Sequence, residues 1–149
     1  MTVSNVLKDL VETLEDGREG FAQGAQKLAD IGRTELSATF HRLSQQRAEF
    51  SAELRELARQ RGVDIDEEGS MAAALHRGWM SLKDAIAGDD PEGVLDAAEQ
   101  GEDHAVSEFD SALEDDELTP QVREVVERQR KDIKAAHDQV RAARDVHTS

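Results

Sequence analysis

Three polar residues occupy positions where the pattern of the predicted helices expects apolar ones. Arg47, Glu102 and Gln129 each interrupt an apolar stripe at the middle of a predicted long helix. Helical bundles hold their metal and cofactor sites at this depth, on side chains that face the bundle interior. An arginine stays protonated and offers five N–H donors, so it can take the place of a cation beside a carboxylate. We therefore expect Arg47 to pair with Glu102, so that the layer closes on itself.

Two further residues are expected to complete this layer. Gln129 and Asp16 can supply the remaining hydrogen bonds of the pair, and Gly17 leaves room for the guanidinium. Removing one partner of a buried ion pair leaves an unpaired charge in the core, which destabilises a protein by about 3–5 kcal/mol. Replacing both partners by apolar residues is expected to change the stability little.

The histidines do not form the ligand motif of a di-iron bundle. Such bundles use a Glu from each of two helices and a Glu-x-x-His motif from each of the other two. None of the five histidines has an acidic residue three positions before it, where the chain has Ala38, Ala73, Gly101, Lys134 and Arg144. The sequence therefore predicts no ferroxidase centre.

A single transition-metal site is the alternative interpretation of the histidines. If the second and third long helices are parallel, His41 and His137 lie toward the same end of the bundle, and Asp96 lies at that height. Two imidazoles and one carboxylate suit a first-row transition metal. Each histidine lies beside its apolar stripe, however, which is also typical of a boundary histidine that bonds water or backbone.

Four long helices are predicted to position these residues. Apolar residues recur at spacings of three, four and seven over most of the chain, no strand pattern occurs, and the length suits a single domain over residues 1–149. Glycines are expected to end the first two helices, and Asp-Pro and Thr-Pro pairs to begin the last two. The expected ranges are about 3–29, 35–61, 91–115 and 120–145.

The connection between the second and third long helices is too long for a simple turn. It has about 27 residues and contains a shorter amphipathic pattern at about 71–87, in which Trp79 is expected to anchor the segment on the bundle. A connection of this length can run from one end of the bundle to the other, which makes the two flanking helices parallel. One long crossover of this kind predicts an all-α, ferritin-like four-helix bundle.

Four sequence segments carry a resemblance to a known family. They are DGREGF at 16–21, HRGWMSLK at 76–83 after Gly69, EQGED at 99–103, and the segment from Gln129 through Ile133 to His137 and Asp138. Together they resemble a bacterial family of ferritin-like four-helix-bundle domains of uncharacterised function, over nearly the whole chain. The resemblance implies a bundle distantly similar to ferritins and rubrerythrins, and it implies no established activity.

The charge of the chain disfavours two classes of partner. The formal net charge is -15, and residues 63–119 hold 18 acidic residues against 2 basic ones. Nucleic acids and anionic membranes are attracted by basic surfaces, so neither is expected as a partner. We expect a second copy of the chain or another protein instead. The absence of cysteine, of a leader pattern and of a long apolar run is typical of a cytoplasmic protein.

No motif of a catalytic nucleophile or of a phosphate-binding loop occurs in the chain. The carboxylates of Asp96, Glu99, Asp103 and Asp110 are expected to face solvent. We therefore expect a non-enzymatic bundle that acts as a structural or protein-interaction module, with no catalytic residue and no cofactor. A stress-related role follows from fold analogy alone. The alternative is a metal-binding protein that holds a single transition-metal ion.

Overall fold

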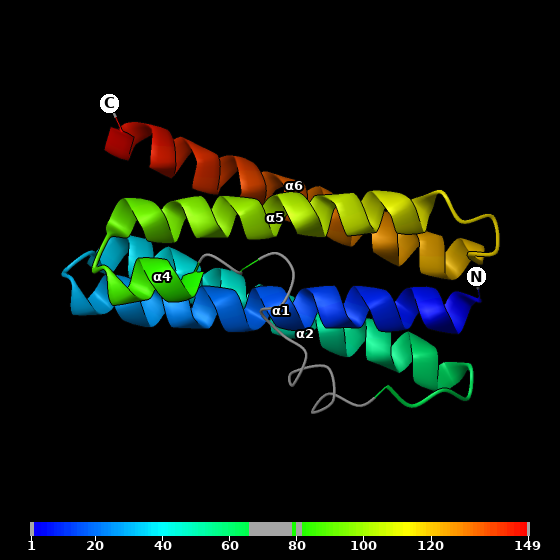
Figure 1. Ribbon diagram of the computed structural model, residues 1–149. Coiled ribbons are helices and arrows are strands. Elements are labelled where there is room, and N and C mark those ends of the chain that lie inside the picture. Colours follow the sequence, from blue (N-terminus) through cyan, green and yellow to red (C-terminus); the bar gives the residue numbers. More distant parts are fainter. Residues whose placement is uncertain (1, 66–78, 80–81, 149) are drawn as a thin grey trace.

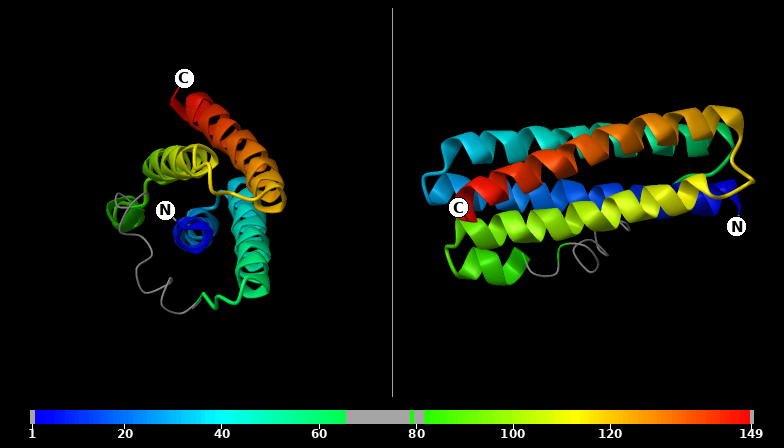
Figure 2. Two further views of the ribbon diagram at one scale, coloured as in Figure 1. Left: turned by 90° about the vertical axis from the view of Figure 1, so that its right-hand side faces the viewer. Right: turned by 90° about the horizontal axis from the view of Figure 1, so that it is seen from above.

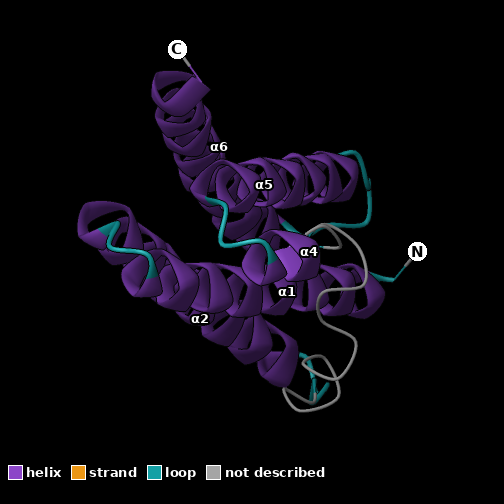
Figure 3. Cartoon of the chain, turned by 60° about the vertical axis from the view of Figure 1, so that its left-hand side comes forward, coloured by secondary structure: helices purple, strands orange, loops and turns teal. Residues whose placement is uncertain are grey.

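The chain is all-helical over the residues that the computed structural model describes, which are 2–65, 79 and 82–148. This confirms the predicted all-α class and a helical bundle, and Figure 3 shows helices joined by loops. Four helices are long and one is short. They are α1 (Val3–Asp30), α2 (Thr34–Gln60), α4 (Leu82–Ala87), α5 (Pro91–Leu113) and α6 (Pro120–Thr148).

The helix ends follow from local side-chain and backbone chemistry. Gly32 and Gly62 both have φ of +82°, a conformation that glycine adopts without strain, and they follow the ends of α1 and α2. At three amino ends a side-chain oxygen accepts a backbone N–H two or three residues further on, which satisfies a donor that the helix leaves free. The capping residues are Thr2, Asp90 and Thr119.

The long helices form two antiparallel hairpins, α1 with α2 and α5 with α6 (Figure 1). The chain leaves α2 at one end of the bundle and enters α4 and α5 at the other end, so α2 and α5 run in the same direction. This is the parallel arrangement that the length of the connection predicted. Helix α4 covers the last part of the predicted crossover helix at 71–87, and residues 66–78, 80 and 81 lie outside the described residues.

The helices do not contact one another equally. Helix α1 packs against both α2 and α5, whereas α6 packs mainly against α5. Figure 2 shows the reason, because α6 is inclined to the other helices and its carboxyl end lies away from α2. Helix α6 therefore has one main neighbour, α5, whereas α1 has two.

A polar layer divides the hydrophobic core into two clusters at mid-length. We define it by Glu15, Asp16, Arg47 and Glu102, all of which are buried. On one side lie apolar residues of segments 3–14, 50–58, 105–112 and 122–133, and on the other side those of segments 21–28, 40–43, 94–98 and 136–140. The bundle thus has polar residues at the depth where the sequence pattern predicted them.

Trp79 fastens the crossover segment to the bundle. The side chain is buried and meets the Phe21 ring at a centroid distance of 4.9 Å. A Cβ atom on either Gly20 of α1 or Gly101 of α5 would lie 2.3 Å from atoms of the indole, closer than side chains approach. The indole therefore fits between the two helices because both positions lack a side chain, which gives a physical role to glycines of the DGREGF and EQGED segments.

None of the described helices combines the length and the apolar character that crossing a membrane requires.

Candidate functional site

The centre of the polar layer is a buried ion pair between α2 and α5. Arg47 is 1% exposed and Glu102 is 0% exposed. Arg47 Nη1 donates to Glu102 Oε1 at 2.5 Å, and Nη2 donates to Oε2 at 2.7 Å. Two parallel bonds of this kind are strong and hold both planar groups in one orientation. The structure thus places together the two residues that the sequence analysis paired.

The guanidinium fills the space around it. A Cβ atom on Gly17 of α1 would lie 3.3 Å from Arg47 Nη1, so the glycine leaves the room that was expected of it. Arg47 Cζ also lies 5.2 Å from the centre of the Phe21 ring, a favourable contact for a cation over an aromatic face. Both oxygens of Glu102 are engaged by the guanidinium, so this carboxylate has no lone oxygen turned toward a central metal.

Gln129 does not complete this pair. Its Nε2 donates to the carbonyl oxygen of Phe50 at 3.3 Å and to Glu53 Oε1 at 2.8 Å, and its neighbours along α6 belong to one apolar cluster. Asp16 is buried on α1, next to the glycine that contacts Arg47. The polar layer therefore consists of residues from α1, α2 and α5, and Gln129 lies outside it.

The register of α5 against α6 explains the position of Gln129. Asp110 pairs with Arg130, and one heptad further along Asp103 pairs with His137. By this register the part of α6 level with Glu102 is next to His137, about two turns or more beyond Gln129. The sequence pattern predicts that the two interrupted stripes are level, and the ion pairs between α5 and α6 set a different alignment.

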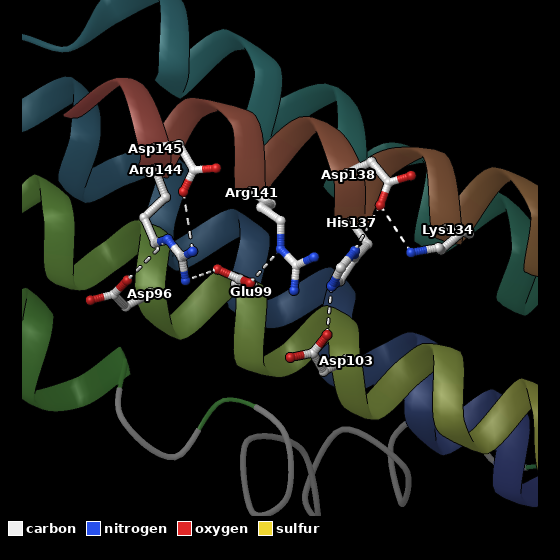
Figure 4. A network of polar contacts seen from close by, with 9 residues as sticks. All are labelled: Asp96, Glu99, Asp103, Lys134, His137, Asp138, Arg141, Arg144 and Asp145. Atoms are coloured by element: carbon white, nitrogen blue, oxygen red, sulfur yellow. Dashed lines mark hydrogen bonds and ion pairs between the residues drawn. The ribbon is translucent and has the colours of Figure 1, made fainter. Parts of the chain in front are cut away.

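A second polar cluster is centred on His137, at the interface of α5 and α6 (Figure 4). The histidine is 4% exposed. Its Nε2 lies 2.5 Å from Asp103 Oδ1, and its Nδ1 lies 3.0 Å from Asp138 Oδ1. A neutral imidazole has one N–H, so it can donate to only one of these carboxylates. The other ring nitrogen therefore faces a carboxylate oxygen with a lone pair, unless a second proton or a metal ion lies between them.

Glu99 brings another carboxylate to the same interface. It is 5% exposed, and its Oε1 accepts from Arg141 Nε at 3.0 Å. Its Oε2 forms an ion pair with Arg144 but accepts no hydrogen bond of good geometry. Ligand atoms of Glu99, Asp103 and His137 all lie within 4.8 Å of one another, a spacing that a single metal ion can bridge.

The hydrogen bond from His137 also acts on Asp138. This bond, followed by the one from Lys134, lowers the pKa of the exposed Asp138 carboxyl below its ordinary value of 3.8. The carboxylate is thus held in the ionised form in which it accepts from Nδ1 of the histidine. Asp138 at Nδ1 and Asp103 at Nε2 each favour a ring proton on the nitrogen that faces them.

The expected site of His41, His137 and Asp96 is not assembled. His41 is exposed on α2, and Asp96 lies 3.9 Å from Arg144 Nε. Among the described residues, the group that surrounds His137 consists of Glu99 and Asp103 instead. The reason is again packing, because α6 lies mainly against α5, and its register there brings Asp103 to the level of the histidine.

Comparison with known proteins identifies the family. A family model described as "Domain of unknown function (DUF2383)" matches residues 2–115. The chain belongs to this DUF2383 family. The match runs from the start of α1 to the end of α5, so Glu99, Glu102 and Asp103 lie inside the DUF2383 region and His137 lies outside it. A search of curated proteins finds no match to the chain.

One signal in the sequence could have revealed the second cluster. Acidic residues of α5 are separated by three, four and seven positions, and their partners on α6 are separated by the same intervals in reverse order. Antiparallel helices bring such residues opposite one another. Of the four carboxylates expected in solvent, Glu99 is buried, whereas the other three are partly exposed and also pair with α6. The pairs are Asp96 with Arg144, Glu99 with Arg141, Asp103 with His137, and Asp110 with Arg130.

Proposed function

We propose that this DUF2383 chain is a non-enzymatic, ferritin-like helical bundle that acts as a structural or protein-interaction module. The observation that carries the proposal is the Arg47–Glu102 pair. It is buried between the two apolar clusters, at the depth where ferritin-like bundles hold their metal centre. A fixed guanidinium supplies there the positive charge that a metal would supply, so the centre of the bundle stabilises the fold instead of carrying out chemistry.

The topology supports the ferritin-like part of this proposal. Two antiparallel hairpins are joined by a long crossover, and α2 runs parallel to α5 (Figure 1). Bundles with a single long crossover include the ferritin-like folds. The fold analogy also supports a stress-related role, but fold alone is a weak guide to function.

The composition supports a protein as the partner, either a second copy of the chain or another protein. The net charge of -15 opposes binding to phosphates of nucleic acids or to anionic lipids. A cytoplasmic location is part of the proposal and is supported by the absence of cysteine, which suits a reducing compartment. Sedimentation velocity over a range of protein concentrations tests whether a second copy is the partner.

An iron oxidation assay tests whether the centre of the bundle catalyses the oxidation of ferrous iron. Ferrous iron is added to the full chain in air, and the formation of ferric iron is followed by absorbance against buffer alone. We expect the same rate with wild type, with Glu102→Gln and with buffer. An acceleration by wild type that Glu102→Gln abolishes would show that the central carboxylate serves a metal, and would refute the proposed function.

A further inference from the structure

We propose that Glu99, Asp103 and His137 bind one divalent first-row transition-metal ion at the α5–α6 interface. This site is separate from the Arg47–Glu102 pair and goes beyond the proposed function. Glu99 and Asp103 come from successive turns of α5, and His137 comes from α6, so the ion would join the two helices of the second hairpin (Figure 4). The ligand atoms lie within 4.8 Å of one another, and two metal bonds of about 2.0–2.2 Å span at most about 4.4 Å, so small side-chain movements bring all three atoms onto one ion.

The two hydrogen-bonding directions of His137 favour a metal at Nε2. Histidine ligands of metals usually donate the other ring N–H to a carboxylate, which fixes the tautomer. Asp138 Oδ1, 3.0 Å from Nδ1, is such an acceptor. Nε2 lies 2.5 Å from Asp103 Oδ1, a distance that one ring proton bridges. A metal ion would replace this proton, and because its bonds of about 2.0–2.2 Å need more room, the exposed Asp103 side chain would move outward to bind it.

Glu99 provides a buried carboxylate at this interface. Its Oε1 accepts from Arg141 Nε at 3.0 Å, and its Oε2 forms an ion pair with Arg144. A metal ion would therefore share this carboxylate with the two arginines.

The site is rigid on one side and open on the other. His137 and Glu99 are buried, so the packing of α5 and α6 holds both side chains in place. The Asp103 side chain is 59% exposed, and an open groove of about 370 Å³ is lined by Asp103, Lys134 and His137. A hydrated ion can therefore reach the histidine from solvent without any movement of the helices.

The charge of the surrounding network matches a divalent ion. The network in Figure 4 contains five carboxylates and three permanently basic side chains around His137, an excess of two negative charges when the histidine is neutral. Arg141 and Arg144 already contact Glu99, so they compete with a cation for that carboxylate. We therefore expect a reversible site whose affinity depends on these arginines.

The ligand types narrow the class of metal. One imidazole nitrogen with two carboxylates suits zinc, ferrous iron, manganese or cobalt. Calcium and magnesium prefer sites made of oxygen atoms alone, and no cysteine is present to select a softer ion. Zinc and cobalt are the probes of choice, because zinc has no redox chemistry and cobalt reports its coordination through visible absorption.

Calorimetric titration of the metal-free full chain with zinc chloride near neutral pH tests the proposal. We expect one ion per chain for wild type and a loss of affinity of at least about tenfold for Asp103→Asn. This variant keeps the size of an exposed side chain, so it should fold. The matched control is His41→Gln, which removes an exposed histidine of α2 and should bind zinc as wild type does.

Three further variants separate a metal site from a salt bridge. Arg141→Gln removes a competing charge and should tighten zinc binding, and Asp138→Asn should weaken it by about 10- to 100-fold. His137→Gln should abolish the visible absorption of bound cobalt.

The outcomes distinguish this proposal from the proposed function. If neither wild type nor Arg141→Gln binds zinc, or if Asp103→Asn and His137→Gln bind as wild type does, the site is refuted. If His137→Gln fails to fold, as judged by the fluorescence of the single tryptophan, Asp103→Asn alone decides. Zinc binding that is lost in Glu102→Gln but kept in Asp103→Asn would refute this site and the closed centre of the proposed function together.

Discussion

The α1–α2 hairpin and the α5–α6 hairpin are held together by different chemistry. In the first, three serines of α2 at heptad spacing each donate their hydroxyl to an oxygen of α1. The pairs are Ser37 with Ala25 O at 2.7 Å, Ser44 with Arg18 O at 2.8 Å, and Ser51 with Glu15 Oε1 at 2.7 Å. We refer to Ser37, Ser44 and Ser51 as the serine seam. Small side chains and short bonds let the two helices approach closely along their length.

The α5–α6 hairpin uses charged side chains instead, at spacings of seven and four residues. Its pairs join Asp110 to Arg130, Asp103 to His137, and Glu99 to Arg141. Figure 4 shows the last two pairs. We refer to these three pairs as the charged ladder. Most of its members are partly exposed, and exposed ion pairs contribute little to stability because water and salt screen them.

This difference indicates which hairpin stabilises the fold and which hairpin responds to salt, pH and cations. Hydroxyl bonds to backbone carbonyls, as for Ser37 and Ser44, depend little on salt or pH. Partly exposed charges depend on both, and they also provide ligand atoms for a cation. The first hairpin, together with the central ion pair, is therefore the rigid half, and the second hairpin is the half where binding can take place. Five predictions test this division.

The largest effect is expected at the central pair, which joins the two hairpins. Arg47→Met should lower the free energy of unfolding by about 3–5 kcal/mol, because Glu102 is then buried without a partner. The double variant Arg47→Met with Glu102→Leu should recover most of this loss. Urea denaturation followed by tryptophan fluorescence measures both values. Equal stability of wild type and Arg47→Met would mean that the pair does not stabilise the core.

Gly101→Ala tests how the crossover segment fastens the two hairpins. The new methyl group would meet the indole of Trp79, and overpacking of this kind destabilises by about 1–3 kcal/mol. We expect a red shift of the Trp79 emission, because the indole becomes exposed to water. Gly88→Ala is the matched control, since its Cβ atom would lie 3.5 Å from the nearest atom, at ordinary contact distance. A similar red shift in both variants would show that the indole of Trp79 does not depend on the space at Gly101.

Ser51→Ala tests the serine seam. The change leaves Glu15 Oε1 buried without its hydrogen bond, and such a loss destabilises by about 1–3 kcal/mol. We expect the decrease to be the same at low and at high salt, because neither group is exposed to the ions. Thermal unfolding is measured in about 0.05 M and about 1 M sodium chloride, because the Debye length falls from more than about 10 Å to about 3 Å between these concentrations. If the loss of stability caused by Ser51→Ala disappears in high salt, the hydrogen bond between Ser51 and Glu15 is exposed to solvent.

Arg130→Gln tests the charged ladder with a smaller effect. The Arg130–Asp110 pair is partly exposed, so its loss should lower the stability by about 0.2–1 kcal/mol at low salt. In contrast to Ser51→Ala, this decrease should become smaller in high salt. The two variants are compared in one series of thermal unfolding curves. If Arg130→Gln destabilises more than Ser51→Ala, the second hairpin is the rigid half and the division is wrong.

Asp138→Asn is expected to have the smallest effect and to depend on pH. The hydrogen bond from His137 lowers the pKa of this carboxyl below 3.8 in the folded protein. The ionised Asp138 carboxylate therefore stabilises the folded protein at a pH above the pKa of the unfolded chain. This contribution disappears as the pH falls through the lower pKa of the folded protein. The melting temperatures of wild type and Asp138→Asn should differ slightly at neutral pH and converge below about pH 4. A difference that grows toward low pH would contradict the assigned direction.

The helices and the direction of the crossover could be predicted because they follow from local rules. Apolar spacing, the caps at Thr2 and Asp90, and the glycines at 32 and 62 act within a few residues of the chain. The pairing of Arg47 with Glu102 could also be predicted, because a charged residue on an apolar stripe is buried and needs an opposite charge at the same depth. The structure places these two residues together.

What the sequence by itself determined is thus the set of helices, their order and direction, and the depth of the polar layer. Only the tertiary structure decided how far α6 is displaced along α5, and with it the partners of Gln129 and His137. The physical reason is that a helix can shift along its neighbour by whole heptads and keep its apolar stripe buried. The choice among these registers depends on all the charged pairs between the two helices at once, and no single residue reveals it.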